Sequence, residues 1–162
     1  MTNTNKIKIL QLNIRGMKKR LLDRQTLITE KSPHIITLNE TFLNGSQTIT
    51  LNGYETIIFN RPTHGCGVAM LIKSTIDYDE VMKIHINQHE IIQCRVQINE
   101  KDHIYLTSIY ARPQTKIYLD IFTALNKESS ILLNITFNNK IKETNDINFT
   151  ISKTSLIINI TI

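Results

Sequence analysis

The N-terminal part of the chain contains two apolar runs separated by a helix-like segment, and this order restricts the fold more than any other feature. Residues 6–13 (KIKILQLN) carry β-branched and apolar side chains on both faces, as a central strand does. Residues 18–31 have the spacing of an amphipathic helix that stops before Pro33, and residues 35–39 (IITLN) predict the next strand. A strand, a helix and a second strand predict a right-handed crossover with parallel strands.

Polar side chains stand where these two strands end. Asn13 closes the first strand, and Glu40 directly follows the second. Because the carboxyl ends of parallel strands share one edge of a sheet, we expect Asn13 and Glu40 to lie close together. A lone acid at a strand end is often a solvated surface group, and a lone asparagine there often forms a turn. The pair by itself therefore leaves a structural and a functional interpretation open.

After the crossover the pattern changes to short strands joined by polar turns. The expected antiparallel strands cover residues 54–60, 67–73, 90–98 and 103–111. Helical spacing returns over residues 115–127, and a short strand is expected over 131–133. The last residues, 155–162, are again strand-like. Whether this last strand pairs within the chain or with another copy stays open, and without a partner it would leave an aggregation-prone sheet edge.

Composition favours a single domain with acidic partners. At 162 residues and 41% hydrophobic content, the chain is long enough for one buried core, so we expect residues 1–162 to form one domain. Nineteen Lys and Arg against fourteen Asp and Glu give a net charge of +5, which favours partners such as nucleic acid.

Cysteine content and hydropathy bear on where the protein works. Cys66 and Cys94 form no CxxC pair and cannot build a disulfide framework, which favours a reducing compartment and makes a cysteine metal site an unattractive hypothesis. The sequence contains no signal-peptide pattern and no apolar run of membrane-spanning length. We therefore expect an intracellular protein, in the nucleus or cytoplasm, with no membrane partner.

Five ordered segments resemble a known family. They read ILQLNIRGM, IITLNETFL, GYETIIFNRPTHGCGVAMLIK, LTSIYARPQT and ILLNITFNN. In order and spacing they resemble the endonuclease/exonuclease/phosphatase superfamily, and most of all the endonuclease domain at the front of non-LTR retrotransposon polyproteins. The resemblance covers residues 8–139 best and leaves 140–162 as a shortened C-terminal part. It implies an incomplete four-layer α/β sandwich with mixed sheets.

The resemblance also implies an activity, a metal and a partner. Members of the family cut phosphodiester bonds with Mg²⁺, here in DNA, and need no small-molecule cofactor. Glu40 matches the metal-binding acid and Asn13 matches the amide that helps to place metal and phosphate. These residue types suit Mg²⁺, which takes oxygen ligands and usually keeps one or two carboxylates together with waters and phosphate.

Further site residues follow from the same segments. Tyr110 matches a tyrosine beside the scissile phosphate, and Asn138 matches the asparagine that ends the Gly-Asp-Phe-Asn motif of the family. Both are implied catalytic residues. Arg61 and Arg112 are candidates for phosphate binding, although arginines are common on any basic surface.

The sequence departs from the family at two catalytic positions. The segment ILLNITFNN places Thr136 where the family has the aspartate that aligns the attacking water. The histidine expected near the C-terminus has no counterpart, because the last histidine is His103. Loss of one preorganised group can cost about a hundred- to a thousandfold in rate. We therefore expect impaired catalysis.

Three hypotheses remain at this stage. The first is a Mg²⁺-dependent DNA endonuclease domain of retrotransposon origin with reduced activity. The second is a non-catalytic nucleic-acid-binding or interaction remnant, which the basic charge and the missing acid favour. The third is a decayed gene fragment whose product folds poorly and whose C-terminal strand, if unpaired, predicts aggregation.

Overall fold

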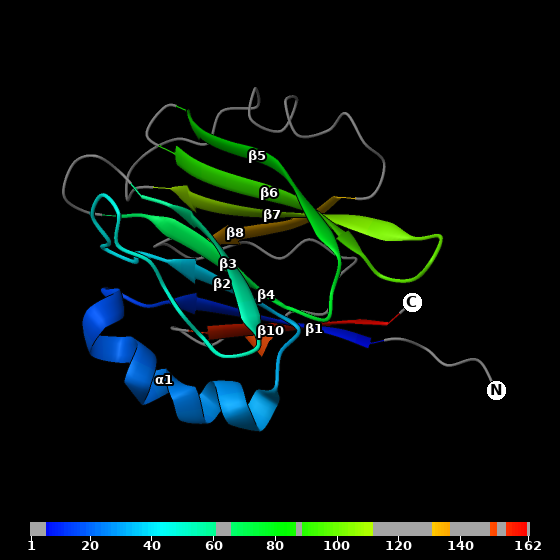
Figure 1. Ribbon diagram of the computed structural model, residues 1–162, viewed down its shortest axis with the longest axis horizontal. Helices are drawn as coiled ribbons and strands as arrows, with labels where there is room; N and C mark the ends of the chain where they lie inside the picture. Colours follow the sequence, from blue (N-terminus) through cyan, green and yellow to red (C-terminus); the bar gives the residue numbers. More distant parts are fainter. Residues whose placement is uncertain are drawn as a thin grey trace.

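Two sheets face each other in the computed structural model, which describes residues 6–60, 66–86, 89–111, 131–136, 150–151 and 155–161 (Figure 1). The first sheet has the order β3 (Tyr54–Phe59), β4 (Val68–Lys73), β2 (Ile35–Asn39), β1 (Lys6–Asn13), β10 (Ser155–Thr161) and β9 (Thr150–Ile151). The second has the order β5 (Tyr78–Ile86), β6 (His89–Gln97), β7 (His103–Ala111) and β8 (Ile131–Thr136). The expected α/β sandwich with mixed sheets is confirmed.

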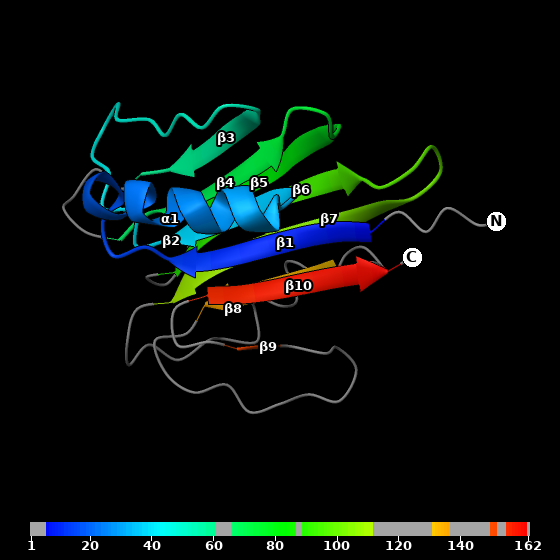
Figure 2. The ribbon, with the colours of Figure 1, turned by 90° about the horizontal axis from the view of Figure 1, so that it is seen from below.

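The predicted crossover is present in the first sheet. Strands β1 and β2 are parallel and place Asn13 opposite Asn39, with helix α1 (Met17–Lys31) connecting them. The helix ends at Ser32, whose left-handed backbone lets its N–H donate to the carbonyl of Ile28, directly before Pro33. Figure 2 shows α1 crossing the outer face of this sheet. The helix thus lies on the face opposite the second sheet.

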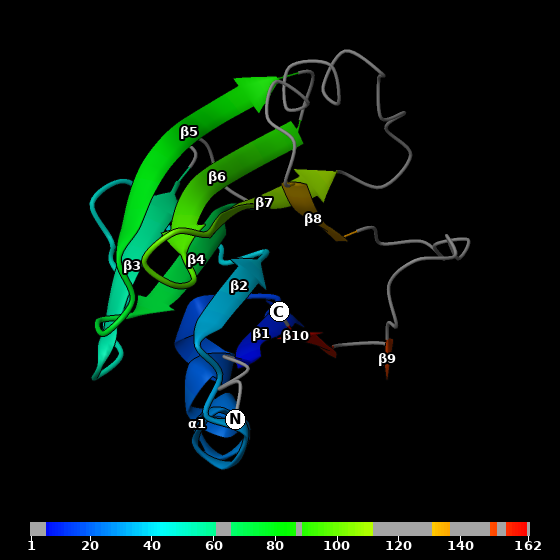
Figure 3. The same cartoon turned by 90° about the vertical axis from the view of Figure 1, so that its right-hand side faces the viewer.

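Two apolar layers hold the elements together. One lies between the sheets and includes Ile9, Ile35, Met70, Ile92 and Leu106. The other lies between α1 and the first sheet; its buried members include Leu10, Leu12, Met17, Ile28, Ile36, Leu38 and Leu71. Alternate residues of β1 and β2 therefore enter different layers, which explains why these strands are apolar on both faces. Figure 3 shows the two sheets and α1 as successive layers.

The antiparallel strands follow the expected pattern with one omission. Strands β3, β4, β6 and β7 lie within one residue of the predicted bounds, and β8 extends the predicted 131–133 to Thr136. Strand β5 was not expected, because Tyr78–Ile86 is a sheet edge with many polar and half-exposed residues and lacks an apolar run. The helix expected over 115–127 lies outside the described residues.

The C-terminal strand pairs within the chain. Strand β10 is antiparallel to β1, from Lys6 opposite Thr161 to Leu12 opposite Ser155, and β9 lies on its other side. Of the two pairings that the sequence left open, within the chain or with another copy, the structure shows the first. Because β10 has a neighbouring strand on each side, it leaves no open sheet edge of the kind that predicted aggregation. That residues 1–162 form one domain stays a prediction.

No helix in the described ranges is long and apolar enough to cross a membrane.

His34, at the end of the sandwich where β2 begins, predicts a pH dependence of stability. Its Nδ1 accepts a hydrogen bond from the backbone N–H of Lys8 at 3.0 Å. Burial, with Lys73 and Lys8 nearby, lowers the pKa of His34 below its usual value. Below about pH 6.5 the unfolded chain therefore binds a proton that the folded chain resists, so the free energy of unfolding should fall as the pH falls.

Urea unfolding at about pH 7.5 and about pH 5 measures this effect. We expect the His34→Gln variant, whose side-chain oxygen still accepts a hydrogen bond, to lose less stability on acidification than the unmodified chain. Equal losses in the two proteins would assign the acid sensitivity to other groups.

Candidate active site

Polar strand ends from both sheets gather at one end of the sandwich. In the first sheet, Asn13 pairs with Asn39 across β1 and β2, and Asn39 pairs with Val68 of β4. In the second sheet, Glu90 pairs with Tyr110, and Tyr110 pairs with Thr136 of β8. This end lies at the left of Figure 1, where β1, β2 and β7 finish. We call it the polar edge.

Asn13 and Glu40 are in direct contact, as the sequence predicted. The Asn13 Nδ2 donates to the Glu40 Oε1 at 3.0 Å, and Glu40 is only 7% exposed. The Arg15 guanidinium lies 4.0 Å from the other carboxylate oxygen, with its side chain 67% exposed. A nearly buried carboxylate is thus held by an amide on one side and a solvated cation on the other.

Unusual backbone conformations concentrate beside this carboxylate. The described residues include five non-glycine positions with positive φ, and four of them, Arg15, Glu40, Phe42 and Cys66, belong to segments at the polar edge. Such conformations cost about 1–3 kcal/mol each and persist only where surrounding contacts impose them. Their concentration at one place is typical of a functional site.

Backbone hydrogen bonds impose this geometry. Beyond the last strand pair, Ile14 N–H donates to Asn39 O at 2.9 Å and Gly16 N–H donates to Glu40 O at 2.8 Å. On the other side, Phe42 N–H donates to Cys66 O at 2.8 Å. The segment around Glu40 is therefore fixed between the turn after β1 and the start of β4.

Glu90 connects the two sheets at the same edge, and the sequence analysis missed it. Its Oε2 accepts the Gly67 backbone N–H at 2.7 Å, and Gly67 O in turn accepts the Thr41 N–H at 3.2 Å. The side chain is completely buried. An acid at the start of the apolar run EIIQCRV was the available signal, because a buried carboxylate needs a specific partner. Glu90 thereby helps to position the residues that follow Glu40.

Tyr110 is buried at the polar edge, in the electrostatic neighbourhood of both carboxylates. Burial raises the pKa of its hydroxyl above the usual value, and a hydrogen bond with Cys66 and the charges of Glu40 and Glu90 act in the same direction. The phenol therefore stays protonated at neutral pH and can act as a hydrogen-bond donor. The structure thus brings Asn13, Glu40 and Tyr110 together.

Three predicted site residues, Arg61, Arg112 and Asn138, lie outside the described residues. Thr136 has a described backbone and is the last residue of β8, in register with Tyr110. The position that carries the aspartate in the resembled family therefore reaches the polar edge.

Several buried polar atoms at this edge lack hydrogen-bond partners. They are both amide atoms of Asn39 and the Thr41 hydroxyl. Buried polar groups are nearly always satisfied in proteins, by other groups or by bound species. Together with the Glu40 carboxylate they form a set of oxygen-rich groups, which is the donor chemistry that Mg²⁺ prefers. These residue types therefore fit a divalent metal ion held by Glu40 with Asn13 beside it.

Other kinds of site find less support in the described part of the chain. No group of three or more His, Cys, Asp or Glu side chains is placed there to hold a metal without further ligands. Both cysteines are free, and Cys94 is buried with its pKa raised to about 12, chiefly by burial. Cys94 therefore stays a neutral thiol at neutral pH, which is not the form that binds metals.

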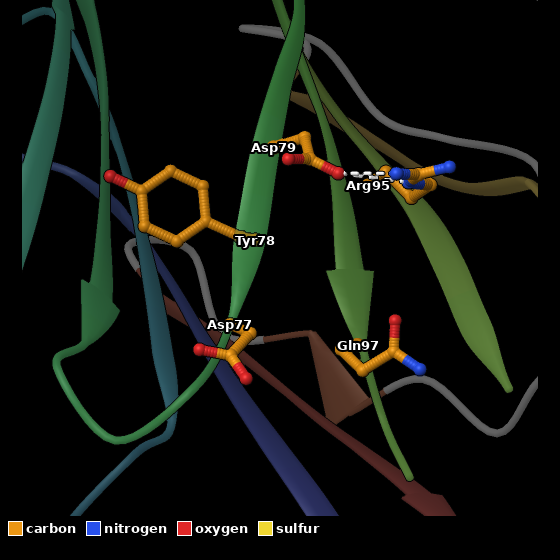
Figure 4. Close-up of a pocket in the computed structure, with 5 residues that line it drawn as sticks. All are labelled: Asp77, Tyr78, Asp79, Arg95 and Gln97. Carbon is orange, nitrogen blue, oxygen red and sulfur yellow. Dashed lines mark hydrogen bonds and ion pairs between the residues drawn. The ribbon is translucent and has the colours of Figure 1, made fainter. Parts of the chain in front are cut away.

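A small hollow lies at the other end of the sandwich. It has a volume of about 80 Å³, and its lining residues are Asp77, Tyr78, Asp79, Arg95 and Gln97 (Figure 4). The Arg95 Nε donates to Asp79 Oδ2 at 3.1 Å, so the single cation in this hollow is already paired with one of its two acids. Ligand pockets usually measure about 300–1,000 Å³, so the hollow is too small for a substrate site.

Comparison with known proteins agrees with the geometry. The endonuclease/exonuclease/phosphatase family matches residues 10–132, which include Asn13, Glu40, Glu90 and Tyr110. The chain belongs to this family. No curated protein sequence matches the chain significantly.

Solved structures of two nucleases have a similar fold. The endonuclease domain of TRAS1, a telomere-specific non-LTR retrotransposon, has a TM-score of 0.63 at 14% identity, covering 83% of this chain and 60% of that one. The 3'-5' exonuclease NExo from Neisseria meningitidis has a TM-score of 0.58 at 16% identity, covering 82% and 58%.

A third similar structure is D. rerio TDP2, complexed with a single-strand DNA product. Its TM-score is 0.51 at 10% identity, covering 80% of this chain and 59% of that one. The chain thus spans about three fifths of the length of these three structures. At these identities the likeness concerns the fold.

Proposed function

We propose that this chain is a Mg²⁺-dependent DNA endonuclease domain derived from a non-LTR retrotransposon, with weakened catalysis. The observation that carries the proposal is the Asn13–Glu40 hydrogen bond at 3.0 Å, at the polar edge of a fold in the endonuclease/exonuclease/phosphatase family. The likeness to the TRAS1 endonuclease domain supports the retrotransposon origin, and the net charge of +5 supports an acidic substrate.

Each described residue has a role in this proposal. Glu40 is the ligand for Mg²⁺, and Asn13 fixes the orientation of its carboxylate. The bound metal supplies polarisation of the phosphoryl group and stabilisation of the leaving oxygen. Tyr110, which stays protonated, donates a hydrogen bond to an oxygen of the phosphate, and Arg15 offers a second positive charge in front of Glu40. Glu90 accepts the Gly67 N–H, and Gly67 in turn accepts the Thr41 N–H, so Glu90 fixes the segment that follows Glu40.

Residues outside the described ranges complete the proposed site. Arg61 and Arg112 bind the DNA backbone, and Asn138 is a catalytic residue. These assignments rest on the family motifs alone. The proposed location is inside the cell, where a chain that cuts DNA meets its substrate.

A second candidate function is nucleic-acid binding without cleavage. Thr136 favours it, because this residue ends β8 in register with Tyr110 and cannot act as the general base that an aspartate would provide. Salt-dependent DNA binding that does not respond to Mg²⁺, without any nicking, would support this alternative.

A plasmid-nicking assay with purified protein tests the proposal. We expect slow nicking in Mg²⁺, none in EDTA, and nicking at the level of the protein-free control for the Glu40→Ala variant, because this variant loses the carboxylate ligand. Mg²⁺ binding measured by calorimetry should be lost together with nicking in that variant.

Two controls make the assay decisive. Thermal unfolding of Glu40→Ala verifies that the variant is folded, and Asp79→Ala removes an acid in the hollow at the other end of the sandwich and should nick like the unmodified chain. Nicking that persists in Glu40→Ala would contradict the assignment of Glu40. A folded, DNA-binding protein that never nicks would leave the binding function as the better account.

A further inference from the structure

An exposed aromatic ring stands beside the candidate metal carboxylate. Phe42 is 42% exposed although it is large and apolar, and the described residues include one other such side chain, Val81, at 48%. Val81 lies in the edge strand β5, whereas Phe42 follows Glu40 by two positions. The exposed ring is therefore part of the polar edge.

The backbone holds this ring outward at an energetic cost. Phe42 has a φ of +53°, a conformation that is unfavourable for a bulky residue, and its N–H donates to Cys66 O at 2.8 Å. A Cβ atom at Gly16 would lie 3.4 Å from the Phe42 Cδ2, so the ring edge lies close to the Gly16 backbone. A strained residue that exposes an apolar ring to solvent is typical of a site where the ring contacts a binding partner.

Arg15 accompanies the ring on the adjoining segment. Its guanidinium is solvated and lies 4.0 Å from Glu40, and its neighbour Gly16 donates a backbone hydrogen bond to Glu40 O at 2.8 Å. The segments carrying Arg15 and Phe42 are therefore joined through Glu40. A cation, a carboxylate and an aromatic face occur together at one rim.

We propose that Phe42 stacks on an unpaired nucleobase of the DNA and that Arg15 binds the adjacent phosphate. This inference rests on the proposed DNA endonuclease function and specifies its substrate. Aromatic rings offer stacking platforms to single-stranded bases, and a guanidinium binds phosphate oxygens. A base inside an intact duplex presents its faces to its neighbours and not to a side chain. The site therefore prefers DNA with an unpaired base at the bound phosphate.

Fluorescence anisotropy with a labelled single-stranded oligonucleotide in EDTA tests the contact separately from cleavage. Affinity is measured between about 50 and 400 mM salt. We expect Phe42→Ala to bind about tenfold more weakly at every salt concentration, with an unchanged salt dependence, because it loses stacking and no charge. Arg15→Gln should lower the slope of log affinity against log salt by about 0.7, because it loses one phosphate contact.

Two further variants control for exposure and strain. Val81→Ala, which removes the other exposed apolar side chain, should bind like the unmodified chain. Phe42→Asn removes the ring but tolerates a positive φ, so it should show the same binding loss as Phe42→Ala without a loss of melting temperature.

The possible results separate this inference from the proposed function. Equal affinities of Phe42→Ala, Phe42→Asn and Val81→Ala, with the unmodified chain binding DNA, would overturn the stacking contact alone. If Phe42→Ala lost the same factor in affinity for single-stranded DNA and for fully paired DNA, the preference for an unpaired base would be overturned. No binding by the unmodified chain at the lowest salt would overturn the inference together with the proposed DNA substrate.

Discussion

Replacing Thr136 with aspartate is expected to raise the rate of Mg²⁺-dependent nicking by about a hundredfold, at the lower end of what a positioned general base contributes. Thr136 ends β8 and pairs in register with Tyr110, whose neighbours include Glu40 and Glu90. A carboxylate at this position would be at the polar edge, where it could orient and deprotonate the attacking water. The gain in rate should stay near a hundredfold because the catalytic histidine of the family would still be missing: the sequence contains no histidine after His103.

The Thr136→Asn variant is the matched control. It has nearly the shape of the aspartate variant but cannot accept a proton, so we expect its nicking rate to equal that of the unmodified chain. Single-turnover nicking of one plasmid preparation compares the three proteins, and Glu40→Ala combined with Thr136→Asp should return the rate to background. If Thr136→Asp binds DNA and Mg²⁺ normally but nicks no faster, the end of β8 does not face the scissile bond.

The sequence was sufficient to predict the crossover and its consequence for the site. Strands at residues 6–13 and 35–39 have the predicted bounds, because apolar side chains on both faces leave a central parallel strand as the best solution. Parallel pairing then places Asn13 beside Asn39 and next to Glu40, and the hydrogen bond between Asn13 and Glu40 follows from that topology. Local pattern and chain connectivity determine this part of the site.

Other parts of the fold and of the candidate site depend on contacts between segments that are distant in the sequence, and no local sequence pattern predicts these contacts. Glu90 belongs to the second sheet, and its partner Gly67 directly precedes β4 of the first, so their hydrogen bond follows from how the sheets pack. Strand β5 was missed because an edge strand exposes one side and needs no apolar run. The pairing of β10 with β1 is also non-local, since it joins opposite ends of the chain.

Gly67→Ala is expected to lower the free energy of unfolding by about 3 kcal/mol. Gly67 has a φ of +92°, and an added Cβ would lie 2.4 Å from the Thr41 hydroxyl oxygen. Thr41 is fully buried and β-branched, so its side chain has few other rotamers. The Gly67 backbone cannot easily shift, because its N–H donates to Glu90 and its carbonyl accepts from Thr41. The methyl group should therefore displace the segment that follows Glu40 and weaken Mg²⁺ binding as well.

Gly53→Ala separates the steric contact from the backbone strain. Gly53 has a φ of +79° but nothing within 4 Å of an added Cβ, so its substitution should cost only about 1 kcal/mol and leave Mg²⁺ binding unchanged. Urea unfolding gives the loss in free energy of unfolding for each variant. The difference between the two losses is due to the collision with Thr41. In the double variant with Thr41→Ala, which removes the colliding oxygen, the Gly67→Ala cost should approach that of Gly53→Ala. Equal losses in free energy of unfolding for Gly67→Ala and Gly53→Ala would mean that the Thr41 side chain moves aside without cost. Gly67 would then not position Glu40.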